Sequence, residues 1–579
     1  MADPRENPAR RVRRQATAGF LLVAFFSFFA NLSVLVSPIY MQQIFDRVLQ
    51  TRHVETLVYL TLITAGLLLA LGAIDTLRAY ALARLGRWWD ESLREDLLSA
   101  AVKAARTSSR AETTAVSDLQ TVRHFVGSPN LFPFFDAPWM PLFIGAIFLL
   151  HPILGMLAVA AAAILIGLAI ITEAGTKRIM KGVAERQGAV QVVAHTAMRH
   201  ADSVHAMGLM PGVLQRYQKH NEPVVEATQR VADFTAMVGG ITKFVRLMVQ
   251  ILVLGIGAYL ATRMELTSGG MIAASIILGR ALSPAEQALG AWKGFVAARE
   301  AHQRIAALFD RVGTDERRMR LPAPRGAVEM SEASFVIPGQ DRAILRNVTL
   351  SFAPGSVVAL IGPSGSGKST LCKLLIGALR PTAGSIRLDG ASVSQWDPNQ
   401  WGETIGYLPQ SVDLFPGTVR ENIARLKEAS DEDVVAAAQI AGCHEMILRL
   451  PKGYDTEVGD GGALLSGGQR QRVGLARAAF GGPRLVILDE PNSNLDGEGE
   501  AALTHAIAGL KALGVTVVIV SHRLTLLASV DTVVTVKDGM IEKVAPREAM
   551  RRDALRPVAA KLSGVGRPVR PVSDAAQAN

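Results

Sequence analysis

The chain of 579 residues is longer than one hydrophobic core usually supports, so two or more domains are expected. Hydrophobic residues make up 49% and charged residues 19% of it, yet the mean hydropathy is only +0.25, which excludes a chain that lies in a membrane throughout. A membrane part joined to a soluble part fits these values. The net charge of +10 could indicate nucleic-acid binding, but no stripe of basic and aromatic residues supports it. We attribute the charge to the cytoplasmic loops of a membrane protein and expect no nucleic-acid partner.

The N-terminal segment, residues 1–16, is rich in arginine and precedes a long apolar run. Signal peptides also begin with basic residues, but the run Ala18–Tyr40 is too long and lacks a small-residue cleavage site. We therefore predict a cytoplasmic segment followed by the first membrane helix. Five further apolar runs approach or reach the length needed to cross about 30 Å of hydrocarbon. They are Leu57–Leu77, Leu131–Leu150, Ile153–Thr172, Val245–Ala261 and Ser268–Leu289.

These runs predict a transmembrane domain of six α-helices within residues 17–310. Long loops rich in Lys and Arg follow the second and fourth runs, and the other connections are short. Because such loops stay in the cytoplasm, both termini are predicted to be cytoplasmic. The periodicity of Trp88–Ala105 predicts that the helices continue beyond the bilayer. Asp136, Arg280 and Glu286 lie in or beside the runs, where they indicate either a transport pathway or ion pairing and packing.

The second half of the chain changes to an α/β pattern. Residues 311–326 carry proline and charge and are predicted to be a linker. Residues 327–558 alternate helical segments with short β-branched strands, which predicts an α/β domain. Residues 559–579 are predicted to be a disordered tail. The clearest strands are Val357–Ile361, Leu485–Leu488 and Thr516–Val520.

The first of these strands runs into a glycine-rich loop that opens a helix. Glycines let backbone N–H groups wrap a phosphate, and the helix N-terminus adds its positive dipole end. Lys368 is expected to reach the β- and γ-phosphates of ATP, and the Ser369 hydroxyl is expected to ligate Mg²⁺. The predicted nucleotide-binding loop consists of Gly362, Pro363, Ser364, Gly365, Ser366, Gly367, Lys368, Ser369 and Thr370.

Two carboxylates, Asp489 and Glu490, follow the buried strand Leu485–Leu488. Beside a phosphate loop, a carboxylate suits Mg²⁺ held mostly through water, and we assign Asp489 that role. Glu490 is predicted to orient the attacking water or to accept its proton. A solvated strand end is the alternative explanation of such a pair, and the phosphate loop upstream favours the catalytic one.

A second glycine-rich motif begins another helix, and its serine and N–H groups form a further site for anions. The motif consists of Leu465, Ser466, Gly467, Gly468 and Gln469. Together with the phosphate loop and the two carboxylates, it resembles the ATP-binding-cassette (ABC) family over about Ala327–Leu555. The resemblance implies a P-loop ABC ATPase domain fused to a membrane α-helical domain of the type I ABC exporter kind, with ATP and Mg²⁺ bound.

The resemblance implies roles for further residues. Gln410 matches the loop glutamine that senses Mg²⁺, His522 matches the switch histidine that contacts the γ-phosphate, and Asp496 lies in the segment that crosses between partners. In this family each nucleotide lies between the phosphate loop of one cassette and the Leu-Ser-Gly-Gly-Gln motif of another, which implies a homodimer with two composite sites. Ile337 departs from the aromatic residue that usually stacks on adenine. The nearby Phe335 is an alternative for that contact, but its side chain is expected to point into the core.

Three strings within the chain resemble the ATPases of type I secretion systems, the PrtD-type protein exporters. They are Asp489–Asp496, Phe135–Pro141 and Leu278–Pro284. This resemblance covers about Ala18–Leu555. It implies ATP-driven export of a protein across the bacterial inner membrane. The cargo is expected to carry an uncleaved C-terminal signal, because residues 1–16 leave no room for a leader peptidase.

The resemblance also implies partners. They are a second copy of the chain, membrane lipid, a periplasmic adaptor (membrane fusion) protein, an outer-membrane tunnel protein and the secreted protein cargo. The short connections on the periplasmic side leave almost no mass to bridge a second membrane. A lipid or small-molecule exporter of the same fold is the alternative.

Overall fold

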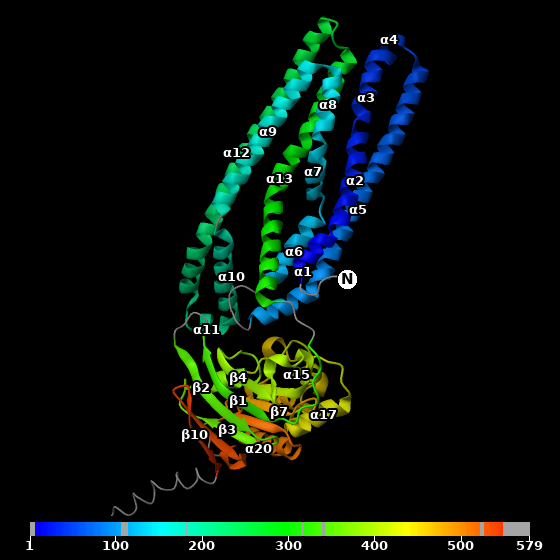
Figure 1. Ribbon diagram of the computed structural model, residues 1–579. Helices are drawn as coiled ribbons and strands as arrows, with labels where there is room; N and C mark the ends of the chain where they lie inside the picture. The colour runs from blue at the N-terminus through cyan, green and yellow to red at the C-terminus, as the bar shows by residue number, and fades with distance from the viewer. Residues whose placement is uncertain are drawn as a thin grey trace, which may run out of the picture. The chain divides into compact units, whose positions relative to one another are not determined.

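The computed structural model describes residues 6–105, 114–180, 182–313, 318–337, 342–521 and 526–547. The chain divides into two compact units, residues 1–314 and residues 315–579. The first unit is helical, and the second combines helices with two β-sheets (Figure 1).

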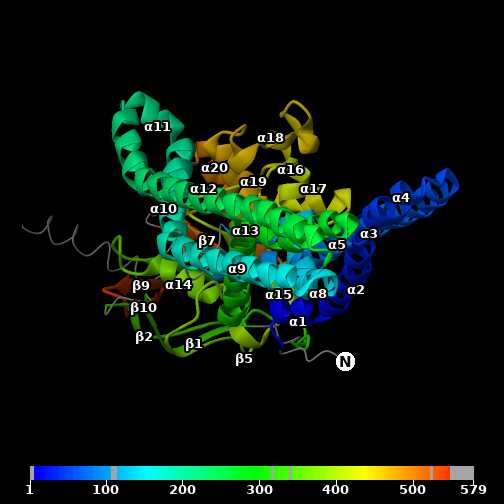
Figure 2. The ribbon, with the colours of Figure 1, turned by 90° about the horizontal axis from the view of Figure 1, so that it is seen from above.

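Long helices make up the first unit. The longest, α5 (Val54–Ala105) and α12 (Met210–Thr262), have 52 and 53 residues. At 1.5 Å per residue each is about 80 Å long, far more than the roughly 30 Å of a bilayer core. The helical continuation expected at Trp88–Ala105 is therefore confirmed. α9 (Pro152–Met180) lies beside α12 (Figure 2). The other helices are α1 (Pro8–Gln15), α2 (Thr17–Val34), α3 (Val36–Gln43), α4 (Leu49–Thr51), α6 (Ala115–Val126), α7 (Phe132–Asp136), α8 (Met140–Leu150), α10 (Val183–Arg199), α11 (Ala201–Ala206) and α13 (Ser268–Val312).

Five helical stretches within the described residues are long and apolar enough to cross a membrane. They are Pro8–Thr51, Val54–Ala105, Pro129–Leu150, Pro152–Met180 and Met210–Thr262. The sixth expected span lies in α13, a helix made less apolar by Arg280 and by several glycines and serines. The buried side chains Leu278 and Leu282 nevertheless place α13 in one apolar core with α8, α9 and α12. The first unit is a multi-pass helical membrane domain.

An interruption of the third expected span carries Asp136. A 3₁₀ turn with Pro138 separates α7 from α8, because proline lacks the N–H that a continuous helix needs. At the end of α7, Asp136 accepts hydrogen bonds from Arg78 Nη2 on α5 (2.6 Å) and from Asn31 Nδ2 on α2 (2.9 Å). The Arg78 guanidinium also lies 4.4 Å from the centre of the Phe132 ring. Of the two alternatives, a transport pathway or ion pairing and packing, these contacts favour ion pairing for Asp136.

Breaking this pair is expected to destabilise the membrane domain. Asp136→Ala leaves the guanidinium of Arg78, whose side chain is 4% exposed, without its closest carboxylate. Removing one partner of a buried pair costs about 3–5 kcal/mol, so the thermal unfolding midpoint of the purified protein should fall clearly. Asp75 also pairs with Arg78 but is 53% exposed, so Asp75→Ala should cost less than about 1 kcal/mol. Equal losses for the two variants would contradict the assignment.

The second unit contains two sheets. One has the strand order β2-β1-β4-β5 and is antiparallel. The other has the order β10-β9-β3-β8-β7-β6, in which β10 is antiparallel and the other neighbours are parallel. The strands are β1 (Val328–Val336), β2 (Ala343–Phe352), β3 (Val357–Ile361), β4 (Ala383–Leu388), β5 (Ala391–Ser392), β6 (Ile405–Leu408), β7 (Leu485–Asp489), β8 (Thr516–Val520), β9 (Thr532–Lys537) and β10 (Met540–Pro546). The helices are α14 (Lys368–Leu375), α15 (Pro398–Thr404), α16 (Val419–Ile423), α17 (Asp431–Ile440), α18 (His444–Leu448), α19 (Gly467–Ala479) and α20 (Gly497–Ala512).

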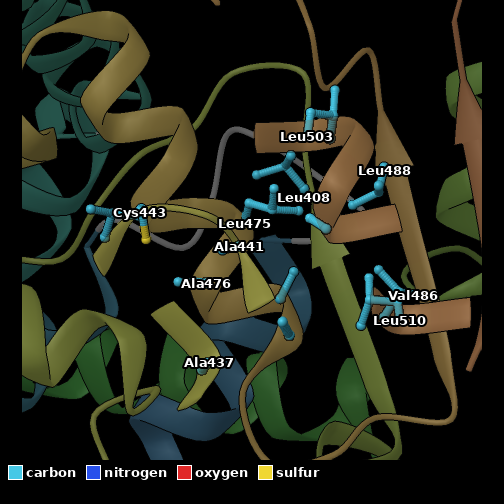
Figure 3. Packing of buried hydrophobic residues seen from close by; sticks show 14 of the residues in the cluster. Leu408, Ala437, Ala441, Cys443, Leu475, Ala476, Val486, Leu488, Leu503 and Leu510 are labelled. Atoms are coloured by element: carbon cyan, nitrogen blue, oxygen red, sulfur yellow. The ribbon is translucent and has the colours of Figure 1, made fainter. Parts of the chain in front are cut away.

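The parallel sheet forms the centre of this unit. Two of its inner strands, β7 and β8, are buried along their whole length, which explains their nearly continuous Val, Ile and Leu sequence. Side chains of β7 pack against α19 and α20, with Leu488 and Leu503 among the residues of this core (Figure 3). The strands predicted at Val357–Ile361 and Thr516–Val520 are confirmed as β3 and β8. Because parallel strands end at the same edge, β3 and β7 present their C-terminal residues together.

Candidate nucleotide-binding site

The loop between β3 and α14 has a backbone that requires glycine at two positions. Gly362 has φ +150°, and a Cβ there would overlap the carbonyl oxygen of Val536. Gly367 has φ +100°, and its Cβ would lie 2.8 Å from Leu345 Cδ2. These glycines bring the loop close to its neighbours and lead directly into the N-terminus of α14, where free N–H groups favour an anion. The buried Ser366 hydroxyl has no hydrogen-bond partner among the described residues.

Lys368, the first residue of α14, folds back over this loop. Its Nζ donates hydrogen bonds to the carbonyl oxygens of Gly362 and Pro363, both at 2.9 Å. Burial lowers the pKa of Lys368, and the nearby carboxylates of Glu490 and Asp489 oppose that shift. The loop therefore holds an ammonium group at the place where a phosphate would be bound.

Ser369 and Asp489 converge from α14 and the end of β7. The Ser369 hydroxyl donates a hydrogen bond to Asp489 Oδ1 at 3.2 Å. Burial raises the pKa of Asp489, and the bond from Ser369 partly offsets this effect. A hydroxyl and a carboxylate are oxygen ligands of the kind that Mg²⁺ prefers. Together with phosphate and water oxygens, these two ligands would fit an Mg²⁺ ion. Among the described residues no group of three or more His, Cys, Asp or Glu is suited to hold a metal.

Glu490 follows Asp489 and has an unusual backbone. Its φ is +51°, a left-handed conformation that costs free energy for a residue with a Cβ and that occurs often at functional sites. The side chain accepts a hydrogen bond from Gln410 Nε2 at Oε2 (2.9 Å). Gln410 thus contacts the carboxylate of Glu490 in this structure, and its expected contact with Mg²⁺ stays a prediction.

The motif Leu465–Gln469 caps the N-terminus of α19. The Ser466 hydroxyl accepts a hydrogen bond from the Gln469 backbone N–H (3.2 Å), and the Gln469 side chain accepts one from the Ser466 N–H (2.9 Å). This reciprocal capping box satisfies two N–H groups of the first turn. In the part of the chain described, no hydrogen bond joins Ser466 or Gln469 to residues 362–370.

The other four residues singled out from the sequence lie in different parts of the second unit. Asp496 caps α20, where its Oδ1 accepts a hydrogen bond from the Gly499 N–H at 2.8 Å. Phe335 is 8% exposed within the core of the antiparallel sheet, as expected, and Ile337 is 36% exposed. His522 lies outside the described residues.

Gln471 lies on α19 behind the motif and was not predicted from the sequence. Its Nε2 donates a hydrogen bond to the carbonyl oxygen of Pro491 at 2.6 Å, immediately after Glu490. Gln471 occupies the helical stripe that continues with Leu475 and Ala478, both buried. A glutamine in an otherwise apolar stripe was the available signal.

Two family models match the chain. The ABC transporter transmembrane region matches residues 20–282, and the ABC transporter model matches residues 345–493, which include the phosphate loop, the motif on α19 and both carboxylates. The chain is an ABC transporter, an ATPase coupled to transport. It belongs to the family of type I secretion system ATP-binding proteins, since it is 39% identical over 547 residues to PrsD of Rhizobium meliloti (strain 1021), with 94% of each chain covered.

Other relatives agree with this assignment. The cyclolysin secretion/processing ATP-binding protein CyaB of Bordetella pertussis is 30% identical over 527 residues, which cover 89% of this chain and 73% of that protein. A solved structure of a bacterial Atm1-family ABC exporter with ATP bound matches with a TM-score of 0.78 at 21% identity, over 96% of this chain and 99% of the other. That last similarity supports the exporter fold of both units.

Proposed function

We propose that this ABC transporter exports a protein with an uncleaved C-terminal secretion signal across the bacterial inner membrane. The observation that carries the proposal is the 39% identity to a type I secretion ATP-binding protein, because it extends over 94% of both chains and so includes the membrane domain as well as the ATPase. We propose the domain limits expected from the sequence: residues 1–16, 17–310, 311–326, 327–558 and 559–579.

ATP is proposed to bind with its phosphates at residues 362–370. Lys368 would exchange its two carbonyl partners for phosphate oxygens, a change favoured by the stronger charge-assisted bond. Mg²⁺, held by Ser369, Asp489 and Gln410, would neutralise charge on the phosphates. Glu490 would take the proton of the attacking water, and His522 would contact the γ-phosphate.

Two copies of the chain are proposed to share two such sites. Ser466 and Gln469 bond to each other within the motif, and no hydrogen bond among the described residues joins either of them to residues 362–370. Each motif would therefore complete the site of the second copy, with Asp496 in the segment that crosses between them.

The proposed location is the inner membrane, with both termini in the cytoplasm and lipid around the helices. The long basic loops support this orientation. A periplasmic adaptor protein and an outer-membrane tunnel protein are proposed as partners, since such a chain needs both to carry cargo past a second membrane.

ATPase stimulation by cargo tests the proposed function. The purified transporter in lipid vesicles is mixed with C-terminal fragments of repeat-in-toxin proteins and proteases secreted by the same bacterium, and phosphate release is measured. We expect at least one fragment to raise or lower the rate about twofold or more, because a ligand that favours one state of a transport cycle changes its flux. Fragments that lack the last residues serve as controls. A response to lipid composition but to no fragment would favour the lipid exporter instead.

A further inference from the structure

Gln471 is a buried polar residue in apolar surroundings, where a hydrophobic side chain would pack equally well. It is 2% exposed on α19 and lies among Leu408, Leu475, Leu495 and Leu503. Figure 3 shows three of these leucines meeting from β6, α19 and α20. Its Oε1 has no hydrogen-bond partner among the described residues. A buried amide that is only partly satisfied weakens a core, so packing alone does not account for this residue.

The amide of Gln471 reaches the main chain at the catalytic carboxylate. Besides the 2.6 Å hydrogen bond to the Pro491 carbonyl oxygen, Nε2 lies 3.4 Å from the carbonyl oxygen of Glu490. Glu490 holds the left-handed φ of +51° at this point. Such a conformation persists only where surrounding contacts enforce it, and the donated hydrogen bond is one of those contacts.

The next residue, Arg472, holds the other end of the same loop. Its guanidinium lies 3.7 Å from Asp496 Oδ1 and 3.7 Å from Glu498 Oε1, and its side chain is 11% exposed. Two consecutive residues of α19 thus connect this helix to the beginning and the end of the segment 490–496. The helix itself begins with the motif that contains Ser466.

We propose that Gln471 is a positioning residue that sets the direction of the Glu490 carboxylate and joins the two shared ATP sites within each chain. This inference rests on the proposed function, in which the motif at the start of α19 serves one nucleotide and Glu490 serves the other. Because Gln471 connects α19 to the main chain beside Glu490, nucleotide contact at the motif moves the general base of the second site. The link lies inside the second compact unit and needs no change in the membrane part.

Three variants test this role through basal ATP hydrolysis by the full transporter without cargo. Gln471→Met keeps the volume and removes the donor. We expect kcat to fall about 10- to 100-fold, as expected for a misdirected catalytic group, while the ATP concentration at half-maximal binding changes less than twofold. The Hill coefficient for ATP should fall towards 1. Leu475→Met, one turn further along the same buried face, should leave all three values near those of the wild type.

Gln471→Glu distinguishes hydrogen bonding from packing through the pH dependence of kcat, which a side chain that only fills space would not alter. A protonated carboxyl can donate a hydrogen bond to the Pro491 carbonyl, and an ionised one cannot. Burial raises the pKa of such a carboxyl, so kcat relative to the wild type should recover as the pH falls from 8 to 6. The relative kcat of Gln471→Met should stay constant over that range.

Two results would overturn the proposal. One is a wild-type kcat and Hill coefficient in Gln471→Met, and the other is a pH profile of Gln471→Glu that runs parallel to that of Gln471→Met. Wild-type hydrolysis without cooperativity would instead count against the shared sites of the proposed function, and the kcat and pH comparisons would still decide the role of Gln471. None of these measurements uses cargo, so their outcome is independent of the cargo-stimulation test of the proposed function.

Discussion

Glu490→Gln is expected to abolish ATP turnover while two copies of the chain still close around ATP. Glutamine keeps the size and the hydrogen-bonding reach of the side chain but cannot accept the proton of the attacking water. General-base catalysis contributes about 10²–10⁴-fold to a rate, and we expect a loss in that range. The phosphate loop and the motif on α19 are unchanged by the substitution, so binding and closure should persist.

Phosphate release and ATP-dependent association of the two cassettes measure the two parts of this prediction separately. Closure can be followed by the distance between spectroscopic labels placed on the cassettes of the dimer. Glu432→Gln, which changes an exposed glutamate of α17, is the matched control and should hydrolyse ATP normally. A near-normal rate in Glu490→Gln would remove Glu490 as the general base, and loss of closure would mean that the carboxylate is needed for binding.

Asp489→Asn is expected to remove Mg²⁺-dependent turnover and yet to stabilise the nucleotide-free protein. The loss follows from the proposed role of the carboxylate as a metal ligand, since a metal supplies several kcal/mol of transition-state stabilisation, and we expect a decrease of about 10²–10³-fold. The stabilisation follows from burial, which raises the pKa of Asp489. A carboxyl with a raised pKa in the folded state stabilises the fold only at low pH, and this contribution disappears as the pH rises through the folded pKa.

At pH 7.5 the buried charge of Asp489 therefore lowers the free energy of unfolding of the wild-type protein, and asparagine has no such charge. The unfolding midpoint of Asp489→Asn should exceed that of the wild type by on the order of 2 °C, and the difference should shrink as the pH falls and the wild-type carboxyl becomes protonated. Thermal unfolding without nucleotide or Mg²⁺ at several pH values measures this. A lower midpoint for Asp489→Asn at pH 7.5 would contradict the prediction.

Asp531, in the same domain, is a control for which the opposite change in the unfolding midpoint is expected. Burial alone would raise its pKa, but the hydrogen bonds from Lys511 and from the Val357 N–H hold the pKa below its usual value. A lowered pKa contributes stability above the unfolded pKa that is lost as the pH falls. Asp531→Asn should therefore lower the unfolding midpoint at pH 7.5 and change it less in acid.

Local features could be predicted because their causes lie within a few neighbouring residues. The phosphate loop needs a strand, glycines with positive φ and a helix start, and all three occur between Val357 and Thr370. The buried strands Val357–Ile361 and Thr516–Val520 follow from continuous β-branched sequence. The expected span Ser268–Leu289 is not among the five described helical stretches that are long and apolar enough to cross a membrane, although its helix α13 shares an apolar core with α8, α9 and α12.

The sequence by itself thus determined the class of the protein, and it predicted the nucleotide loop, the two carboxylates and the motif on α19 as the parts of its site. Only the tertiary structure decided which distant residues meet. Ser369 and Asp489 are 120 positions apart and Gln410 and Glu490 are 80 apart, and their contacts depend on the strand order β3-β8-β7-β6. Periodicity reports which face of an element is buried but not which element covers it, so it could not show that Asp136 pairs with Arg78 or that Gln471 reaches Pro491.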